Sequence, residues 1–331
     1  MLKNLSLVIK ANQDFVRHTG DDAKTNAPIL SSLYDSISYT YIPLLRMIDN
    51  LSRDNVPCRF GLVIPPVLCN LLSDEVIQES YIEWLDKKIE LGTKELARLS
   101  DDGKKTELCQ LVVDEYVLLK DEFINRYEKN LIQVFSEYMN KGYIELLGTT
   151  GTDVFIPHFA DLKEIISAQI ECGLHAYKQY FGIVPDGFWL PGFGYTPGIE
   201  KLIKGFGYTY TILDSRSVLL LENMPSSGIF YPTRTDNSLV LFARDSRISE
   251  EVFGKEGYYK NSVYRNENRD IGFDLPLDQL VDFFGENDHR YATGYKYWNK
   301  TISQGEESLY NPKLAKEQSM KDAKAFVDKR L

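Results

Sequence analysis

Residues 187–213 read GFWLPGFGYTPGIEKLIKGFGYTYTIL, and three patterns follow one another in this stretch. Two short apolar runs, GFWL at 187–190 and YTYTIL at 208–213, are bounded by turn-forming residues, which is typical of strands buried in a parallel sheet. Between them, TPGIEKLIKGFG at 196–207 begins with a Thr-Pro start signal and carries apolar residues at three- and four-residue spacing, which indicates a helix. A strand, a helix and a second strand in this order predict a βα unit.

The same alternation extends along the rest of the chain. A second helical pattern, ADLKEIISAQIECGLHAYKQYF, occupies residues 160–181. Further apolar runs are LSLVI at 5–9, RFGLVI at 59–64, YIELLG at 143–148 and LVLFA at 239–243. Repeated βα units favour an α/β fold built on a parallel sheet or barrel.

Two regions depart from this alternation. Residues about 73–141 carry many charges, with Leu, Val, Ile and Phe at helical intervals. We expect two or three helices here, inserted between the second and third strands, with the charges on a solvated face. The end of the sequence, NPKLAKEQSMKDAKAFVDKRL at 311–331, has the pattern of an amphipathic helix, and no strand-like run follows it. The expected organisation is one domain, 1–331, with a helical insertion.

Charge and composition exclude several classes of partner. The 331 residues include 38 Lys and Arg against 48 Asp and Glu, a net charge of −10, which disfavours binding to nucleic acid. The first apolar run is too short for a signal peptide, and no apolar span approaches the roughly 18 residues of a membrane helix. The four cysteines are widely spaced and indicate neither a disulfide framework nor a zinc site. We therefore expect a cytoplasmic protein that binds neither nucleic acid nor a membrane.

Polar residues that follow the predicted strands are the first candidates for function, because sites in parallel α/β folds gather beyond the carboxyl ends of strands. A carboxylate follows three of the strands: Asp153, Asp214 and Asp245. Aspartate at such a position serves either as acid, base or nucleophile, or as the cap of the next helix. Other polar candidates at strand ends are Lys10, Asn12, Gln13, Asp14, Thr149, Thr150, Thr152 and Arg244.

The segment GFWLPGFGY at 187–195 is dense in aromatic residues beside glycines and a proline. Exposed rings such as Trp189, Phe193 and Tyr195 stack on sugars in many carbohydrate sites. The alternative is that Phe188 and Trp189 fill the interior of a barrel.

Metal, phosphate and serine-nucleophile chemistry lack their usual motifs. The four histidines form no HxxxH or HExxH pair that would place two metal ligands on one helix face. The chain also has no GxSxG elbow and no GxGxxG or GxxxxGK loop. We therefore expect no metal and no cofactor.

Five segments, in order along the chain, resemble motifs of glycoside hydrolase family 57, in particular its α-1,4-glucan branching enzyme and amylase-like clade. ELLGTTGTDVFIP (145–157) resembles ELLGTTATHGFLP, and GFWLPGFGYTPGIE (187–200) resembles GFWLPECGYTPGLE. LFARD (241–245) resembles the strand that carries the family's second catalytic carboxylate. YRNENRDIGFDLP (264–276) and TGYKYWNK (293–300) resemble YREFYRDIGFDLP and TGIKYYRIT.

The resemblance implies a (β/α)7 barrel that acts on α-1,4-glucans by a retaining mechanism. In that mechanism one carboxylate attacks the anomeric carbon, while a second protonates the leaving oxygen and later activates the acceptor. A sugar hydroxyl as acceptor gives a branch, and water gives hydrolysis. The implied ligand is an α-glucan or malto-oligosaccharide, and no cofactor takes part.

The residues expected at the site depart from the family motifs. Gly192 stands where the family's WLPEC motif has its nucleophilic Glu, whereas Asp245 matches the acid/base Asp. The first-strand motif HAHLPYVRH reads KANQDFVRH here, so that Lys10 and Asn12 replace two histidines, and Asp153 replaces the His of the family's ATH. By the resemblance, the substrate-binding residues are Trp189, Phe193, Tyr195, Asp214, Asp153, Arg244 and Asn12.

These departures support one leading hypothesis and two alternatives. The leading one is a branching-enzyme-like protein that is inactive or impaired and keeps weak α-glucan binding. The first alternative is an active α-glucan transferase or hydrolase in which Asp153 or Asp214 replaces the lost carboxylate beside Asp245. The second is polysaccharide deacetylation on a related barrel, which needs a metal held by an Asp and two His that this chain lacks.

The family places a further barrel strand, with an ELFGHWW-like motif, and a helical C-terminal domain beyond the point matched by Leu331. We therefore expect an incomplete barrel without its last strand, with two exposed strand edges. Either the barrel stays open, or a protein partner completes it.

Overall fold

The computed structural model describes residues 4–16, 27–100, 102–220, 224–226, 228–284, 290–300 and 308–330, and it has an α/β fold. Six parallel strands lie side by side in chain order: β1 (Val8–Lys10), β2 (Phe60–Val63), β3 (Ile144–Leu146), β4 (Gly187–Trp189), β5 (Tyr210–Leu213) and β7 (Val240–Ala243). A parallel bridge between Gly148 and Phe188 joins the first three strands to the last three. The short β6 (Thr233–Arg234) pairs antiparallel with β7.

The predicted α/β fold with a parallel sheet is confirmed. Each of the six predicted apolar runs contains a strand, although β1 reaches Lys10, one residue beyond the run at 5–9. Within the described ranges no strand pairing connects β7 to β1, so the sheet is open between its first and last parallel strands.

Several helices form the two connections before β3. Between β1 and β2 the chain forms α1 (Ala27–Ser36), the π-helical turn η1 (Ile37–Tyr41) and α2 (Ile42–Arg53). Between β2 and β3 it forms α3 (Pro66–Leu72), α4 (Glu75–Arg98), α5 (Gly103–Asp121), the π-helical turn η2 (Glu122–Arg126) and α6 (Leu131–Asn140). Asp74 starts α4 as its N-cap, because its carboxylate accepts from the backbone N–H groups of Val76 and Ile77 at 2.9 and 3.3 Å.

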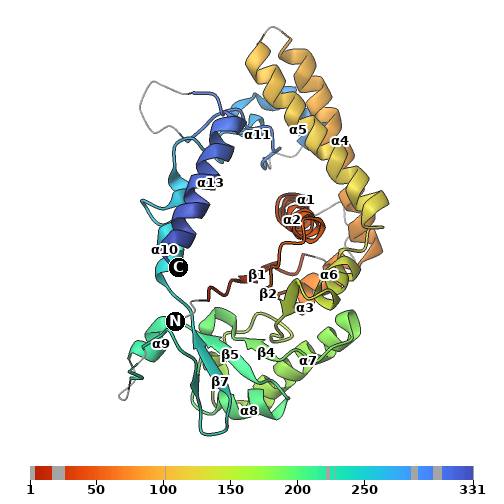
Figure 1. Ribbon diagram of the computed structural model, residues 1–331. Helices are drawn as coiled ribbons and strands as arrows, with labels where there is room; N and C mark the ends of the chain where they lie inside the picture. The colour runs from red at the N-terminus through yellow and green to blue at the C-terminus, as the bar shows by residue number, and fades with distance from the viewer. Residues whose placement is uncertain are drawn as a thin grey trace.

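The remaining helices follow β3. They are η3 (Ile156–Phe159), α7 (Lys163–Phe181), η4 (Pro191–Phe193), α8 (Ile199–Gly205), α9 (Ser215–Leu219), α10 (Arg247–Phe253), η5 (Tyr258–Lys260), α11 (Ile271–Asp274), η6 (Leu277–Gln279), α12 (Val281–Phe284) and α13 (Pro312–Asp328). Helices α7, α8 and α13 lie within the three predicted helical patterns. In Figure 1, α4 and α5 form a pair that extends away from the sheet, and α13 lies beside α10 on the opposite side of the molecule.

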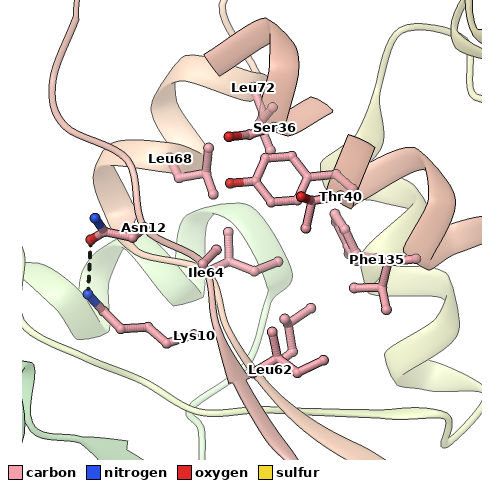
Figure 2. A pocket seen from close by; sticks show the side chains of 13 residues that line it. Lys10, Asn12, Ser36, Thr40, Leu62, Ile64, Leu68, Leu72 and Phe135 are labelled. Carbon is pink, nitrogen blue, oxygen red and sulfur yellow. Dashed lines mark hydrogen bonds between the residues drawn. The ribbon is translucent and has the colours of Figure 1, made fainter. Parts of the chain in front are cut away.

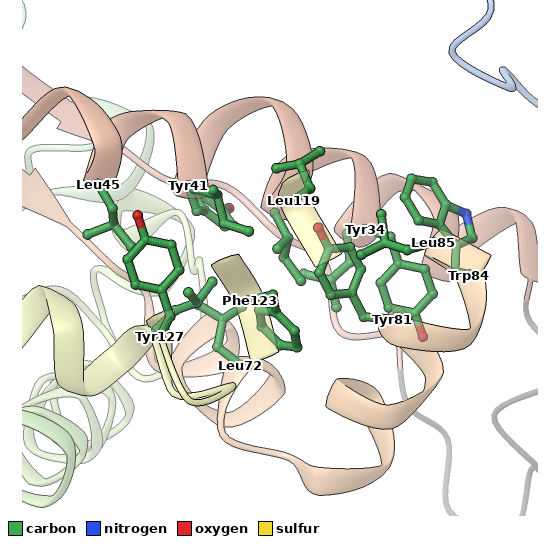
Figure 3. Close-up of a cluster of buried hydrophobic side chains, with 14 of the residues drawn as sticks. Tyr34, Tyr41, Leu45, Leu72, Tyr81, Trp84, Leu85, Leu119, Phe123 and Tyr127 are labelled. Atoms are coloured by element: carbon green, nitrogen blue, oxygen red, sulfur yellow. The ribbon is translucent and has the colours of Figure 1, made fainter. Parts of the chain in front are cut away.

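Apolar side chains gather in three clusters. The largest lies where α1 and α2 pack against α4, α5 and η2, and Figure 3 shows its aromatic centre around Tyr81, Trp84 and Phe123. The second lies between the sheet and helices α7 and α8, with Phe188 fully buried in it. The third is small and comes from several strands: Val63, Leu147 and Ile212 are buried there, with Trp189 and Phe193 packed against them. Phe188 therefore belongs to the core between the sheet and its helices, whereas Trp189 packs, partly buried, against the third cluster.

The segments 264–276 and 293–300, which resemble family motifs, contact the helices α4 and α5. The carboxylate of Asp270, fully buried, accepts from the backbone N–H groups of Gly272, Thr293 and Gly294 at 2.8–2.9 Å. This brings Gly294 against Tyr116 on α5, where a Cβ atom would lie 1.9 Å from the tyrosine oxygen. Buried Lys88 on α4 donates to the carbonyl of Ala292 at 2.9 Å, in the same segment. These contacts join residues 270–294 to α4 and α5.

Two basic residues that follow α13 form ion pairs with α10, the helix after β7. Arg330 and Lys329 contact the carboxylate of Glu251 on α10 at 2.6 and 2.9 Å. Hydrogen bonds from Arg330, Lys329 and Tyr258 lower the pKa of Glu251 to about 2. In the part of the chain that the structure describes, none of the helices has both the length and the apolar character needed to span a membrane.

Candidate functional site

The carboxyl ends of the parallel strands share one edge of the sheet, and the predicted site residues follow them there. Lys10 ends β1, Asp153 lies in the loop after β3, and residues 191–194 follow β4. Asp214 follows β5, and Arg244 follows β7. Their contacts join them in two groups, an ion pair and a cluster of aromatic and arginine side chains.

The ion pair connects the first and third strands across β2. The Lys10 ammonium lies 2.7 Å from the Asp153 carboxylate and donates to the Asn12 amide oxygen at 3.2 Å. The side chain of Lys10 is 16% exposed, and that of Asp153 is 49% exposed. Lys10, Asn12 and Asp153 therefore form one connected polar group.

Asp214 caps α9 and binds two arginines. One carboxylate oxygen accepts from the backbone N–H and the Nε of Arg216 at 3.0 and 2.9 Å, and the other accepts from the Nε of Arg244 at 2.9 Å. Burial alone would raise the pKa of Asp214, but the hydrogen bonds from the two arginines outweigh it and lower the pKa to about 2. Asp214 therefore stays ionised, with both oxygens occupied.

The aromatic part of the cluster connects β4 with β7. The rings of Trp189 and Phe193 lie 4.8 Å apart, centre to centre, and the Arg244 guanidinium lies 4.5 Å from the centre of the Phe193 ring. Trp189, Phe193, Arg244 and Asp214 thus form one continuous group, which we term the aromatic-arginine cluster. It includes four of the seven predicted substrate-binding residues.

Tyr195 lies apart from this cluster. Its ring packs against the second apolar core, and its hydroxyl donates to Glu200 on α8 at 3.0 Å. Burial, with a smaller effect of Glu200, raises the pKa of Tyr195 to about 12. Its local role is to hold the loop after β4 against α8.

Gly192 has a left-handed backbone with a φ of +58°. A Cβ atom at this position would lie 3.1 Å from the Phe155 ring, and one on Gly194 would lie 2.9 Å from the same ring. The ring of Phe155, from the loop after β3, therefore lies against the backbone of the loop after β4.

Asp245 is the second residue after β7 and accepts a hydrogen bond from the start of α10. Its carboxylate accepts from the backbone N–H of Arg247 at 3.0 Å, in the first turn of α10. The side chain is partly exposed. Asp214 is thus the N-cap of α9, whereas Asp245 lies one residue before Ser246, the N-cap of α10.

Sequence reasoning missed two residues of this region. Phe155 lies in the motif at 145–157, two residues after Asp153, but nothing in its spacing indicates a contact with a loop 37 residues further along. Arg216 lies two residues after Asp214, in the position from which a side chain can return to a helix cap.

A cavity of about 160 Å³ lies beside Lys10 and Asn12. Figure 2 shows side chains that line it, with the hydrogen bond between Lys10 and Asn12. Lys10 and Asn12 line one edge, and the rest is mostly apolar, with Leu62 and Ile64 from the β2 segment and Phe135 from α6. Within the described ranges, no three His, Cys, Asp or Glu side chains come together in a way that would hold a metal ion.

Comparisons with known proteins give a consistent assignment. A sequence profile of glycosyl hydrolase family 57 matches residues 6–280. A 1,4-alpha-glucan branching enzyme from Thermococcus kodakarensis is 27% identical over 320 residues, which cover 89% of this chain and 45% of that enzyme. The chain therefore spans less than half the length of this relative.

Solved structures share the fold. The α-amylase AmyC from Thermotoga maritima matches with a TM-score of 0.91 and 28% identity, over 99% of this chain and 63% of AmyC. A branching enzyme of family 57 from Pyrococcus horikoshii matches with a TM-score of 0.81 and 23% identity, over 98% of this chain and 58% of that enzyme.

Proposed function

Because the chain belongs to glycosyl hydrolase family 57, we propose that it is a branching-enzyme-like protein that binds α-1,4-glucan without cleaving or transferring it. The relative from T. kodakarensis and the motifs at 145–157 and 187–200 support the ligand class. The observation that carries the proposal is that residue 192 is a glycine, in the segment that resembles the family motif with its nucleophilic Glu.

A retaining glycosidase needs two carboxyl groups about 5–5.5 Å apart, one of which forms the covalent intermediate. Asp245 supplies one carboxylate in this chain. Gly192 has no side chain, and the Phe155 ring lies beside the place where one would begin. Without an attacking group the covalent step has no route, and loss of such a group typically removes several orders of magnitude in rate.

The two substitute carboxylates are already engaged. Each carboxylate oxygen of Asp214 accepts a hydrogen bond from an arginine, Arg216 or Arg244. Before Asp214 could attack a sugar, one oxygen would have to lose such a charged hydrogen bond. Asp153 is paired with Lys10 at 2.7 Å. Asp153 fits the catalytic alternative better than Asp214 does, because about half of its side chain is exposed.

The replacements at family histidine positions are complementary. Lys10 and Asp153, which replace two of these histidines, form an ion pair with each other. Neutral imidazoles donate and accept hydrogen bonds to sugar hydroxyls, whereas this pair satisfies its own charge. We infer that the region has been rebuilt for binding or for stability in place of bond cleavage.

We also infer that the six parallel strands are part of a seven-stranded barrel. In the described residues no pairing joins β7 to β1, and a further strand, from another segment or from a partner protein, would close the barrel. The domain would then comprise 1–331, with α4, α5 and α6 in the predicted insertion at about 73–141.

Titration calorimetry with maltoheptaose, together with product analysis after long incubation with amylose, tests the proposal. We expect saturable heat that returns to baseline after each injection, and neither new reducing ends nor new branches. Asp245→Asn is the matched variant, and it should behave as the unaltered chain does.

Products from the unaltered chain that disappear in Asp245→Asn would overturn the proposal and favour the catalytic alternative. In that case Asp153→Asn should also abolish the products, because Asp153 would be the attacking group. Absence of any binding heat from folded protein would refute glucan binding itself.

A further inference from the structure

The cavity of about 160 Å³ in Figure 2 lies on the opposite face of the sheet from the aromatic-arginine cluster. Leu62 and Ile64, which line the cavity, belong to the largest apolar cluster, together with residues of the helices before β3. Val63, the residue between them, belongs to the third cluster, against which Trp189 packs. Because successive side chains of a strand point to opposite faces, β2 separates the cavity from Trp189. The cavity is therefore a site of its own.

The walls of this cavity are mostly apolar and buried. Leu68 and Leu72 on α3 and Phe135 on α6 line it, and each is buried. An apolar cavity of about 150 Å³ lined by such side chains stays free of water and takes up benzene, so this volume fits one six-membered ring. Asn12 and Thr40 also line the cavity and are exposed, so a small molecule can enter between the end of β1 and η1.

Hydroxyl groups from one segment make part of the wall polar. Ser36, Thr40 and Tyr41 line the cavity from the end of α1 and from η1, and Figure 2 shows Ser36 and Thr40 among the lining side chains. Residues five apart point in different directions in an α-helix. The π-helical turn, closed by the N–H of Ile42 donating to the carbonyl of Ile37, brings Ser36 and Tyr41 to one side. Single π-helical turns of this kind are frequent at functional sites.

These hydroxyls can bind a polar group of a ligand while keeping their own hydrogen bonds. The Ser36 hydroxyl donates to the carbonyl of Ser32, one turn earlier, at 2.9 Å, which leaves its two lone pairs as acceptors. Burial, partly offset by a hydrogen bond with Ser36, raises the pKa of Tyr41 to about 12, so this phenol stays protonated at neutral pH. A few polar groups in a mostly apolar pocket fix the orientation of a small ligand.

We propose that this cavity binds a small molecule with one six-membered ring and one hydroxyl, of the phenol class. The ring lies between Leu62 and Ile64 of the sheet and Leu68 of α3, and its hydroxyl donates to Ser36. This inference does not depend on glucan binding, because the cavity and the aromatic-arginine cluster lie on opposite faces of the sheet.

Ligand-observed NMR titrations with phenol and with benzene test the proposal. We expect saturable binding of phenol to the unaltered chain. Ala11→Leu and Leu44→Phe each enlarge a side chain that lines the cavity, and each should weaken phenol binding at least about 10-fold. Leu202→Phe makes the same enlargement at a partly buried position on α8, outside the cavity, and should leave the affinity within about 2-fold.

Ser36→Ala tests the hydroxyl contact by itself. Loss of one hydrogen bond should weaken phenol binding about 2- to 10-fold and leave benzene binding within about 2-fold, because benzene has no hydroxyl. Ser32→Ala is the matched control, since it removes a hydroxyl from the same helix but keeps the carbonyl to which Ser36 donates. It should change neither affinity.

The opposite results would overturn the proposal. Absence of saturable phenol binding to the folded chain would do so, and so would phenol binding that both enlarged variants retain, because the ligand would then lie elsewhere. If Ser36→Ala weakens phenol and benzene equally, or weakens neither, the hydroxyl contact and the ligand class are wrong. Thermal unfolding shows that each variant is folded, and Leu44→Phe still tests the cavity if Ala11→Leu does not fold.

Discussion

Gly192 has a backbone conformation that opposes any side chain. With a φ of +58°, a side chain there costs about 1–2 kcal/mol, and its Cβ would also meet the Phe155 ring at 3.1 Å. Gly192→Glu should therefore lower stability and, on its own, give no glucan product. Gly192→Glu with Phe155→Ala removes the contact and should recover part of the stability, as measured by thermal unfolding.

Product assays complete this comparison. If Asp245 can still act as acid and base, the double variant should be the first to form product from amylose, with Phe155→Ala alone as the control. A Gly192→Glu variant that is as stable as the unaltered chain would show that Phe155 does not occupy the space of the missing side chain.

Lys88 makes stability depend on pH in a defined direction. Burial lowers its pKa from 10.5 to about 8, despite the opposing carboxylates of Asp35 and Asp270. Between pH 8 and 10.5 the unfolded chain therefore binds a proton that the folded chain has released, so this residue makes stability rise with pH. Its contribution should grow by about 1 kcal/mol per pH unit in this interval.

Urea unfolding at pH 7.5 and pH 9, in the unaltered chain and in Lys88→Met, measures this effect. The difference between the two proteins isolates Lys88 from buried Cys69 and Cys109, whose raised pKa values act in the opposite direction above about pH 9. We expect the unaltered chain to gain stability relative to Lys88→Met as the pH rises. A difference that is independent of pH would contradict the buried, weakly basic lysine.

At the scale of the elements, the sequence predicted those strands and helices that depend on a regular spacing of apolar residues. The six strands and the helices α7, α8 and α13 have apolar residues at regular intervals, and burial of those residues is what fixes each element. The segment that forms α1, η1 and α2 was missed. Its helical register changes at the π-helical turn of Ile37–Tyr41, so the apolar residues do not keep one spacing along the segment.

Contacts within the site were predictable only in part. The sequence placed Asp153, Asp214 and Arg244 at strand ends because parallel strands share an edge, and the structure agrees on those positions. It could not predict that Lys10 pairs with Asp153, 143 residues away, or that Phe155 lies against Gly192. Such pairs depend on how two loops meet after the sheet has formed, and no local spacing encodes that.

At the scale of the whole molecule, Tyr177 links the two halves of the sheet. It lies on α7, is fully buried, and its hydroxyl donates to the carbonyl of Leu147 beyond β3 at 2.5 Å while accepting from the N–H of Ile64 beyond β2 at 3.2 Å. The bridge between Gly148 and Phe188 lies one residue further along. The helix that covers β4 and β5 is therefore bonded to the strands of the first three-stranded sheet.

Tyr177→Phe tests whether this bond joins the large core to the second one. The change leaves two buried backbone groups without their partner, which costs about 1–3 kcal/mol. If the bond couples the cores, calorimetry should show the single unfolding transition broaden or divide in two, because each core can then unfold separately. Tyr180→Phe, on the same helix and partly buried, is the control and should leave the transition unchanged. One sharp transition at an unaltered temperature in Tyr177→Phe would mean that packing between α7 and its neighbours, and not this hydroxyl, makes the two halves unfold as one.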